Sequence, residues 1–234
     1  MAGLGPDRVF LALDVETLEE ALALVRRLRP AGVRFKAGLQ LFCRYGPDGV
    51  RRLQEASGPV LLDLKLHDIP NTVGRAVAAL SDLGIWGVTL HASGGPVMLR
   101  SAVDAASSAR CPFRCLGVTV LTSLDEQILH VLGVRMRLAD QVAALAELAS
   151  AAGCDGVVAS PHEVRVVRRV ARPECLVVTP GVRPAYSVRG DQARAATPGE
   201  VAASGADYLV VGRPVTQAPD PVAALSQILR EIAP

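Results

Sequence analysis

The chemistry-bearing residues of this 234-residue chain gather around its two lysines. Lys65 follows Asp63 by two residues, and Lys36 closes a short apolar run. The chain has 25 basic residues, and all of them except these two lysines are arginines. Because an ammonium group can release a proton whereas a guanidinium stays charged, lysines that persist in an arginine-rich chain are candidate proton donors. Residues i and i+2 of a strand share a face, so Asp63 and Lys65 are expected to point the same way.

Each of these charges also has a purely structural interpretation. Asp63 and Lys65 could form an ion pair at a strand end, and Asp14 could stabilise a helix N-terminus. The scarcity of lysine indicates a G+C-rich genome or selection against thermolabile residues, and the two lysines could be chance survivors. Charges gathered at one partly dry site are costly unless they are paired, so a functional cluster is the better account.

Two glycine–arginine turns have the composition of a phosphate site. One is Pro180–Pro184, with the sequence PGVRP, and the other is Val211–Pro214, with the sequence VGRP. Backbone N–H groups in such turns can face an anion, and arginine adds a bidentate partner. The polar loop Ala185–Pro198 between the two turns is a candidate lid.

Short apolar runs alternate with longer helical patterns along the chain. Each run is nearly continuously apolar and ends at a turn or a polar residue, as in parallel strands that are buried on both faces. The eight predicted strands are Arg8–Asp14, Gly32–Ala37, Pro59–Lys65, Ile85–His91, Arg114–Leu121, Asp155–Ser160, Cys175–Thr179 and Asp207–Gly212.

The segments between the strands have the periodicity of amphipathic helices. Thr17–Leu28 opens with the spacing of a capping box, and Arg137–Ala152 has the clearest apolar stripe. The long connection from Thr122 to Leu138 is expected to carry a short extra helix. Eight β-then-α units predict an α/β fold, a (β/α)8 TIM barrel that forms a single domain over residues 1–234. A doubly wound sheet is the alternative, but the first unit lacks a G-x-G-x-x-G turn.

A parallel barrel carries its active site at the carboxyl ends of its strands. The predicted strands place many polar residues at that rim, and both lysines are among them. The two glycine–arginine turns follow strands seven and eight, where such barrels commonly bind phosphate. The predicted rim residues are Asp14, Lys36, Asp63, Lys65, His91, Thr122, Arg183 and Arg213.

Composition argues against several other classes of protein. Half of the residues are apolar, which is incompatible with a disordered chain. No apolar run reaches the roughly 18 residues of a membrane span, and the first residues lack the pattern of a secretory signal. A net charge of +2 and an aromatic content of 3% argue against binding to nucleic acid.

The five cysteines are odd in number and scattered, and only Cys111 and Cys115 lie close together. No second pair completes a zinc site, and His67, His130 and His162 do not have the spacing of metal ligands. We therefore expect no metal site, and reduced, mostly buried thiols in a cytoplasmic protein.

The segment Asp63–Thr72, with the sequence DLKLHDIPNT, closely resembles the orotidine 5′-phosphate decarboxylase family. Its D-x-K-x-x-D core is shared with relatives that act on sugar phosphates, whereas the ten-residue form is more specific. The similarity extends along nearly the whole chain, through LALD, FKAGLQLF, LHASGG, VLTS, TPGVRP, GDQARAATP and VVGRP. It implies a homodimer of barrels that converts orotidine 5′-phosphate to UMP without cofactor or metal.

The resemblance also implies a role for each matching residue. Lys65 would protonate C6 of the pyrimidine after CO2 is lost, with Asp63 beside it and Asp68 reaching the site of the partner subunit. Lys36, also counted among the catalytic charges, would hold ribose hydroxyls together with Asp14. The remaining substrate-binding residues that it implies are Ile69, Thr72, Thr122, Arg183, Gln192, Gly212 and Arg213.

Two alternatives stay open on the sequence. A magnesium-dependent sugar-phosphate lyase, of the 3-keto-gulonate-6-phosphate decarboxylase or hexulose-phosphate synthase type, shares the D-x-K-x-x-D core but has a carboxylate at the position of Lys36. The second alternative is a catalytically silent barrel that binds nucleotides. The presence of both Asp63 and Lys65 argues against a silent barrel.

Overall fold

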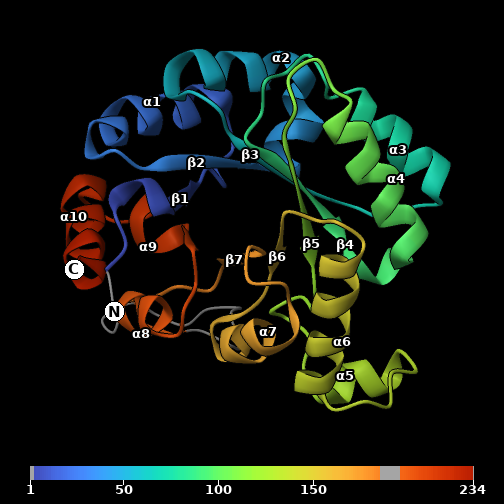
Figure 1. The fold of residues 1–234 in the computed structure, drawn as a ribbon. Coiled ribbons are helices and arrows are strands. Elements are labelled where there is room, and N and C mark those ends of the chain that lie inside the picture. The colour runs from blue at the N-terminus through green and yellow to red at the C-terminus, as the bar shows by residue number, and fades with distance from the viewer. Residues whose placement is uncertain (1–2, 185–195, 234) are drawn as a thin grey trace.

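Eight parallel strands close into a barrel in the computed structural model, which describes residues 3–184 and 196–233 (Figure 1). Each strand pairs with the next in chain order, and β1 pairs with β8 to complete the ring. This closure confirms the predicted (β/α)8 barrel and excludes the doubly wound alternative, whose sheet is open. The strands are β1 (Val9–Ala12), β2 (Arg34–Gly38), β3 (Leu61–Leu66), β4 (Gly87–His91), β5 (Arg114–Val118), β6 (Gly156–Val158), β7 (Leu176–Thr179) and β8 (Tyr208–Val211).

Helices surround the barrel and connect successive strands (Figure 1). The predicted capping box is confirmed at the first of them: the Thr17 hydroxyl accepts a hydrogen bond from the Glu20 backbone, and the Glu20 carboxylate accepts one from the Thr17 backbone. The helices are α1 (Leu18–Leu28), α2 (Leu39–Ser57), α3 (Pro70–Ala78), α4 (Gly95–Ser107), α5 (Glu126–Val131), α6 (Leu138–Ala151), α7 (Val164–Val170), α8 (Pro198–Ala203), α9 (Arg213–Thr216) and α10 (Pro221–Ile232).

The strands are shorter than the apolar runs that predict them. β1 ends at Ala12, so Asp14 lies two residues beyond the strand, and β5 ends at Val118, three residues before Leu121. Apolar residues continue past β1 and β5 because the turns there are buried too, as at Leu13 and Val120. The short helix expected between Thr122 and Leu138 is present as α5. Among the described helices, none is long and apolar enough to cross a membrane.

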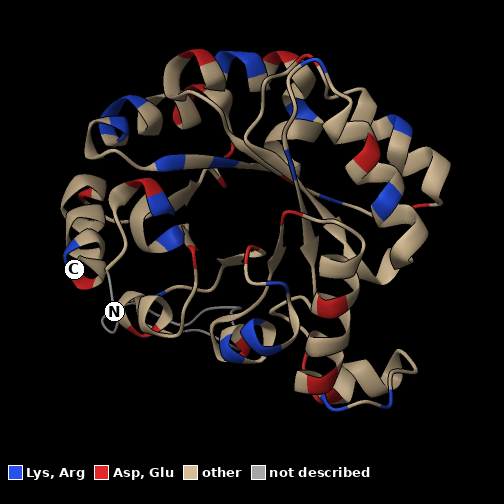
Figure 2. Ribbon diagram, in the orientation of Figure 1, with Lys and Arg blue, Asp and Glu red and all other residues tan. Residues whose placement is uncertain are grey.

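Two apolar layers hold the barrel, because side chains alternate between its interior and the surrounding helices. On β1, Phe10 and Ala12 point into the barrel, whereas Val9 and Leu11 pack outward against the helices. Charged residues lie mostly on the helices and loops, and the strands are largely uncharged (Figure 2). The charges that do lie on the strands are therefore exceptions that need an explanation.

Three aromatic rings close the interior at the amino ends of the strands. The Phe10 ring centroid lies 4.8 Å from that of Trp86 and 5.4 Å from that of Tyr208, and the last two are 5.1 Å apart. The guanidinium of Arg114 lies 4.7 Å over Trp86, and that of Arg8 lies 5.0 Å over Tyr208. This aromatic cluster fills the end of the barrel opposite to the predicted active site.

The cysteines follow the predicted pattern in part. Cys115, Cys154 and Cys175 are buried near the amino ends of their strands, whereas Cys43 and Cys111 are exposed. Burial raises the pKa of the Cys154 thiol to about 12 and also raises that of Cys115. These buried thiols are inert at neutral pH and act as small apolar residues.

Candidate active site

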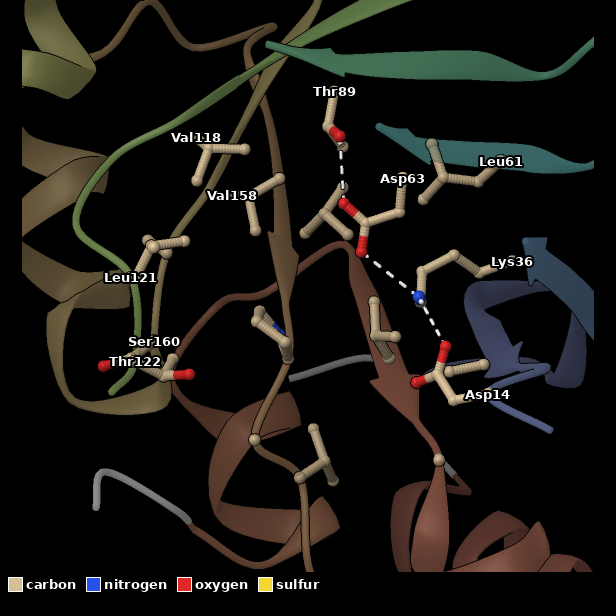
Figure 3. A pocket seen from close by; sticks show the side chains of 18 of the residues that line it. Asp14, Lys36, Leu61, Asp63, Thr89, Val118, Leu121, Thr122, Val158 and Ser160 are labelled. Carbon is tan, nitrogen blue, oxygen red and sulfur yellow. Dashed lines mark hydrogen bonds and ion pairs between the residues drawn. The ribbon is translucent and has the colours of Figure 1, made fainter. Parts of the chain in front are cut away.

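A cavity of about 460 Å³ opens at the carboxyl ends of the strands (Figure 3). This is the end at which parallel barrels place their active sites. Every strand or the turn that follows it contributes to the lining. The polar side chains of the lining are Asp14, Lys36, Asp63, Lys65, Thr89, Thr122, Ser160, Arg183, Arg213 and Gln217.

Four charged side chains form a continuous chain of ion pairs along one wall of the cavity. Asp14 Oδ1 lies 3.4 Å from Lys36 Nζ, and the same nitrogen lies 3.1 Å from Asp63 Oδ2. The other carboxylate oxygen of Asp63 accepts a hydrogen bond of 2.7 Å from Lys65 Nζ. Figure 3 shows the part of this chain that joins Asp14, Lys36 and Asp63. The charges thus alternate in sign, which offsets the cost of holding them in a partly dry site.

Burial and charge act in opposite directions on the two central members of this chain. Burial raises the pKa of Asp63, but the charges of Lys36 and Lys65 and the hydrogen bonds from Lys65 and Thr89 have the larger effect and lower it to about 2. Burial lowers the pKa of Lys36, but the carboxylates of Asp63 and Asp14 raise it above its ordinary value. Both groups are therefore charged at neutral pH, although they are largely buried. Only 8% of the Lys36 side chain and 16% of the Asp63 side chain are exposed.

Strand β3 is irregular at Lys65. Among the described residues, Lys65 is the only one other than glycine with a positive φ, which is +49°. The pairing register of β3 with β4 shifts between Leu62 and Leu66, and the backbone N–H of Lys65 donates to the hydroxyl oxygen of Thr89 at 2.9 Å. Asp63 and Lys65 both line the cavity, as predicted, but a break in the strand and not its regular alternation brings them together.

The last residue of β2 leaves room for these charges. Gly38 lies beside Asp63 in the β2–β3 register. A Cβ atom on Gly38 would lie 3.1 Å from Asp14 Oδ1 and 3.4 Å from Lys36 Nζ. Because the φ of Gly38 is −93°, the backbone conformation itself does not require glycine, whereas a Cβ atom would push against these two charged groups.

Both glycine–arginine turns reach the same cavity, as the sequence predicts. Gly181 and Arg183 follow β7, and Gly212 and Arg213 follow β8, where α9 begins. The first turn is anchored by a hydrogen bond from the Arg183 backbone N–H to the Ala196 carbonyl. Two guanidinium groups and turn backbone at one end of a cavity form a suitable environment for a phosphate.

The wall across from the ion-pair chain is apolar. Figure 3 shows Val118, Val158 and Leu121 on the side of the cavity away from Asp14 and Lys36. A cavity with one apolar wall and one charged wall suits a ligand that has a flat ring and several polar groups.

Most of the predicted site residues meet in this cavity. Thr122 follows β5 and lines the wall beside the apolar residues (Figure 3). His91 differs, because it lies at the end of β4 beside His67, with ring centroids 5.3 Å apart, and is absent from the lining. The predicted residues that line the cavity are Asp14, Lys36, Asp63, Lys65, Thr122, Arg183, Gly212 and Arg213.

Three of the predicted residues do not enter the cavity of their own chain. Asp68, Ile69 and Thr72 are exposed at the start of α3 and are absent from the lining. One oxygen of the Asp68 carboxylate accepts a hydrogen bond of 2.6 Å from the Ile69 backbone N–H. Gln192 and most of the predicted lid, residues 185–195, lie outside the described residues.

Sequence reasoning missed several residues of the site, among them Gln217, which follows α9 and lines the cavity. Thr89 could have been found, because it is a polar residue inside the apolar run Ile85–His91. Ser160 ends a predicted strand. It begins a turn that includes Glu163, to which its hydroxyl donates a hydrogen bond, and it also lines the cavity. Gly38 carries no signal in the sequence, because its importance lies in the space that it leaves.

Comparisons with known proteins agree with this geometry. The sequence model of the Orotidine 5'-phosphate decarboxylase / HUMPS family matches residues 7–228. The chain is 49% identical over 232 residues to the Orotidine 5'-phosphate decarboxylase of Moorella thermoacetica, covering 97% of this chain and 92% of the relative. It is 46% identical over 226 residues to the enzyme of the same name from Nitrosococcus oceani, covering 97% of each.

A solved structure gives the same result for the fold. The crystal structure of Orotidine 5'-phosphate decarboxylase from Lactobacillus acidophilus superposes with a TM-score of 0.82 at 38% identity, covering 96% of this chain and 98% of that one. On sequence, fold and site geometry together, this chain belongs to the Orotidine 5'-phosphate decarboxylase / HUMPS family.

Proposed function

We propose that this chain decarboxylates orotidine 5′-phosphate to UMP, a step in the synthesis of pyrimidines, and that Lys65 is the acid. The observation that carries the proposal is the Lys65 ammonium, held 2.7 Å from Asp63 in a cavity that also contains both glycine–arginine turns. The family match and the relatives named Orotidine 5'-phosphate decarboxylase support this substrate.

In this reaction the bond between C6 of the pyrimidine and its carboxylate carbon breaks. The electron pair stays on C6, and a proton from the Lys65 ammonium then forms the new C6–H bond. The neutral amine regains its proton from solvent. Lys65 therefore supplies first a positive charge beside the developing carbanion and then the proton that replaces CO2.

Asp63 accepts a hydrogen bond of 2.7 Å from the Lys65 ammonium group and holds it in place. Because the pKa of Asp63 is lowered to about 2, its carboxylate carries a full negative charge at neutral pH. We place the carboxylate of the substrate close to Asp63, where charge repulsion raises the energy of the ground state.

The rest of the cavity binds the parts of the substrate that do not react. Asp14 and Lys36 hold ribose hydroxyls, and Thr122 lies near the pyrimidine. The phosphate is bound by Arg183 of the first turn, by Gly212 and Arg213 of the second turn, and by Gln192. Binding energy from a remote phosphate can then be used at the reacting carbon.

We also propose that two chains form a homodimer with shared active sites. Asp68, Ile69 and Thr72 would complete the site of the partner subunit, with Asp68 as the second carboxylate beside Lys65. Their exposure, away from the cavity of their own chain, supports this assignment.

Apolar side chains on the same end of the barrel support the dimer as well. Leu39, Ile69 and Val97 lie at the starts of α2, α3 and α4, and are 50%, 66% and 60% exposed. Large apolar side chains that gather on a surface commonly mark an interface. A two-fold dimer through this face would cover them and bring each Asp68 to the opposite cavity.

A cytoplasmic location fits the five thiols, which are free among the described residues. Reduced cysteines persist in the cytoplasm, where glutathione and thioredoxin keep thiols in that state.

A magnesium-dependent sugar-phosphate lyase fits this cavity less well. The Lys36 ammonium already bridges the carboxylates of Asp14 and Asp63, so a positive charge lies where a divalent cation would need free oxygens. Two carboxylates that are each paired with an ammonium are poor ligands for a hard cation.

The assay that tests the proposed function follows the fall in ultraviolet absorbance as purified protein converts orotidine 5′-phosphate to UMP. We expect turnover that survives an excess of chelator, and no turnover by the Lys65→Ala variant. A requirement for magnesium with a preference for a keto-sugar phosphate would show that the alternative is right. UMP binding without turnover would indicate the silent barrel.

A further inference from the structure

Thr89 of β4 lies at the point where β3 departs from regular geometry. Its side chain is buried, with 2% of the residue exposed, and it lines the cavity from the neighbouring strand (Figure 3). It is also next to both members of the Asp63–Lys65 pair. Neither the sequence pattern nor the family resemblance assigns it a role.

One hydroxyl group makes two different contacts at this point. The Thr89 oxygen accepts a hydrogen bond of 2.9 Å from the backbone N–H of Lys65. The Thr89 O–H donates a hydrogen bond of 2.9 Å to Oδ1 of Asp63. The same Asp63 oxygen accepts the 2.7 Å hydrogen bond from Lys65 Nζ. The hydroxyl therefore connects the backbone of the lysine to the carboxylate that holds its ammonium group.

The backbone contact matters because Lys65 has an unfavourable conformation. A positive φ is costly for a residue with a side chain and persists only where surrounding contacts fix it. Here the register of β3 and β4 shifts between Leu62 and Leu66, and the Thr89 side chain accepts the hydrogen bond of the Lys65 N–H within that interval. A buried N–H without an acceptor would add a further cost of desolvation.

The carboxylate contact fixes which way Asp63 points. Its Oδ1 receives the Thr89 hydroxyl and the Lys65 ammonium, and its Oδ2 faces the Lys36 ammonium at 3.1 Å. The hydroxyl group donates to a charged acceptor in a partly dry site, where hydrogen bonds are stronger than in water. Rotation of the carboxylate would break this set of contacts.

We infer that Thr89 is a positioning residue for decarboxylation, which holds Lys65 and Asp63 in the geometry that the proton transfer needs. The inference rests on the proposed roles of Lys65 and Asp63. Thr89 acts through these two residues and is not itself the acid. Because its hydroxyl bonds to Lys65 and Asp63 and not to the groups assigned to ribose and phosphate, its effect is expected on the chemical step rather than on binding of the nucleotide.

Three variants test this inference. Thr89→Val keeps the branched shape and removes the hydroxyl, and Thr89→Ser keeps the hydroxyl and removes the methyl group. Thr119→Val is the matched control, because Thr119 is also buried and its hydroxyl donates a hydrogen bond of 2.9 Å, but to the backbone carbonyl of Val158. Each variant is assayed for kcat and KM with orotidine 5′-phosphate, for the Kd of UMP, and for its unfolding midpoint in urea.

Loss of one hydrogen bond to a charged group predicts a fall in kcat of about tenfold to hundredfold for Thr89→Val. We expect the KM for orotidine 5′-phosphate and the Kd of UMP to stay within about twofold of the wild-type values. The variant leaves unchanged the contacts that bind the substrate and the transition state equally well. Thr89→Ser is expected to recover most of the lost kcat. Thr119→Val should lower the unfolding midpoint about as much as Thr89→Val does and leave kcat unchanged.

Two outcomes would overturn the inference. One is a kcat for Thr89→Val that matches the kcat of the Thr119→Val control. The other is a parallel loss of kcat and of UMP affinity without recovery in Thr89→Ser, which would indicate a general disturbance of the site. Failure of the proposed function has a different signature, because wild-type protein would then not decarboxylate the substrate, or Lys65→Ala would stay active.

Discussion

The ammonium nitrogen of Lys36 lies 3.1 Å from one carboxylate oxygen of Asp63, and both side chains are largely shielded from solvent. The opposite oxygen of that carboxylate accepts the hydrogen bond from Lys65. Asp63 is thus held between two ammonium groups that lie on different strands. A change at either lysine therefore alters the environment of the other one through the shared carboxylate.

Lys36→Met should reduce turnover by at least about tenfold, since an uncompensated buried charge costs several kcal/mol. The variant removes one of the two positive charges that lower the pKa of Asp63, so that pKa should rise. The measurement is kcat for orotidine 5′-phosphate. Arg34→Met is the control, because Arg34 lies on the same strand and its Nε bonds to the Asp7 carbonyl. Full turnover by Lys36→Met would show that the ion-pair chain is only structural.

Lys65→Arg should fold and bind UMP but lose nearly all turnover. The positive charge is retained, whereas a guanidinium with a pKa above about 12 is a very poor proton donor. Turnover is measured by the absorbance assay, and UMP binding by calorimetry shows that the site is intact. A variant that keeps a tenth of the normal turnover would mean that Lys65 is not the acid.

A mixture of two inactive variants should regain activity if the active sites are shared. Lys65→Ala and Asp68→Asn should each be nearly inactive alone. After subunit exchange, about half of the dimers are hybrids with one doubly altered site and one intact site, so about a quarter of all sites should recover. Mass measurement of the intact dimers checks that hybrids form. If hybrids are present and the mixture stays inactive, Asp68 acts in its own subunit.

Gly38→Ala should weaken UMP binding and turnover while the barrel still folds. The added Cβ would lie 3.1 Å from Asp14 Oδ1 and 3.4 Å from Lys36 Nζ, so the ion pair must shift. The φ of −93° is accessible to alanine, and the effect is therefore confined to the side chains. Gly199→Ala in α8, away from the cavity, is the control. Equal Kd values for UMP in Gly38→Ala and wild type would show that the space is not needed.

The stability of the fold should fall as the pH is lowered below the ordinary pKa of histidine. Burial lowers the pKa of His91, and the charges of His67 and Lys65 lower it further, although Asp63 acts in the opposite direction. Below about pH 6.5 the unfolded chain therefore takes up a proton before the folded chain does, which favours unfolding. The loss stops below the folded pKa, where both states are protonated.

Urea unfolding at about pH 7.5 and about pH 5.5 measures this effect. His91→Gln should show a smaller difference in the free energy of unfolding between the two pH values than wild type. His130→Gln, in an exposed turn of α5, should behave like wild type. An unchanged difference in His91→Gln would assign the pH dependence to other groups.

The barrel could be predicted from the sequence because its strands are nearly continuous apolar runs. Their ends were less predictable, since the turn Thr119–Leu121 is largely buried and continues the apolar pattern of the strand that it follows. The rim residues could be found because they stand at or just after the ends of these apolar runs, and both lysines indeed line one cavity.

The parts of the site that escaped prediction depend on geometry that the residue types do not encode. Regular strand alternation predicts Asp63 and Lys65 on one face, but in the structure β3 is irregular at Lys65. Its φ is +49°, and its backbone N–H donates to the hydroxyl of Thr89 on β4. The small space for a Cβ atom at position 38 is set by Asp14, between β1 and α1, and by Lys36 on β2. Contacts of this kind exist only once the barrel has closed.

The aromatic cluster of Phe10, Trp86 and Tyr208 separates stability from chemistry in this molecule. It occupies the amino end of the same eight strands whose carboxyl ends carry the charges. Substitutions that pack this end more tightly can raise the Tm without contact with the reacting groups. Thermal stability could therefore be engineered at the amino end of the barrel and substrate specificity at the carboxyl end, as two separate tasks.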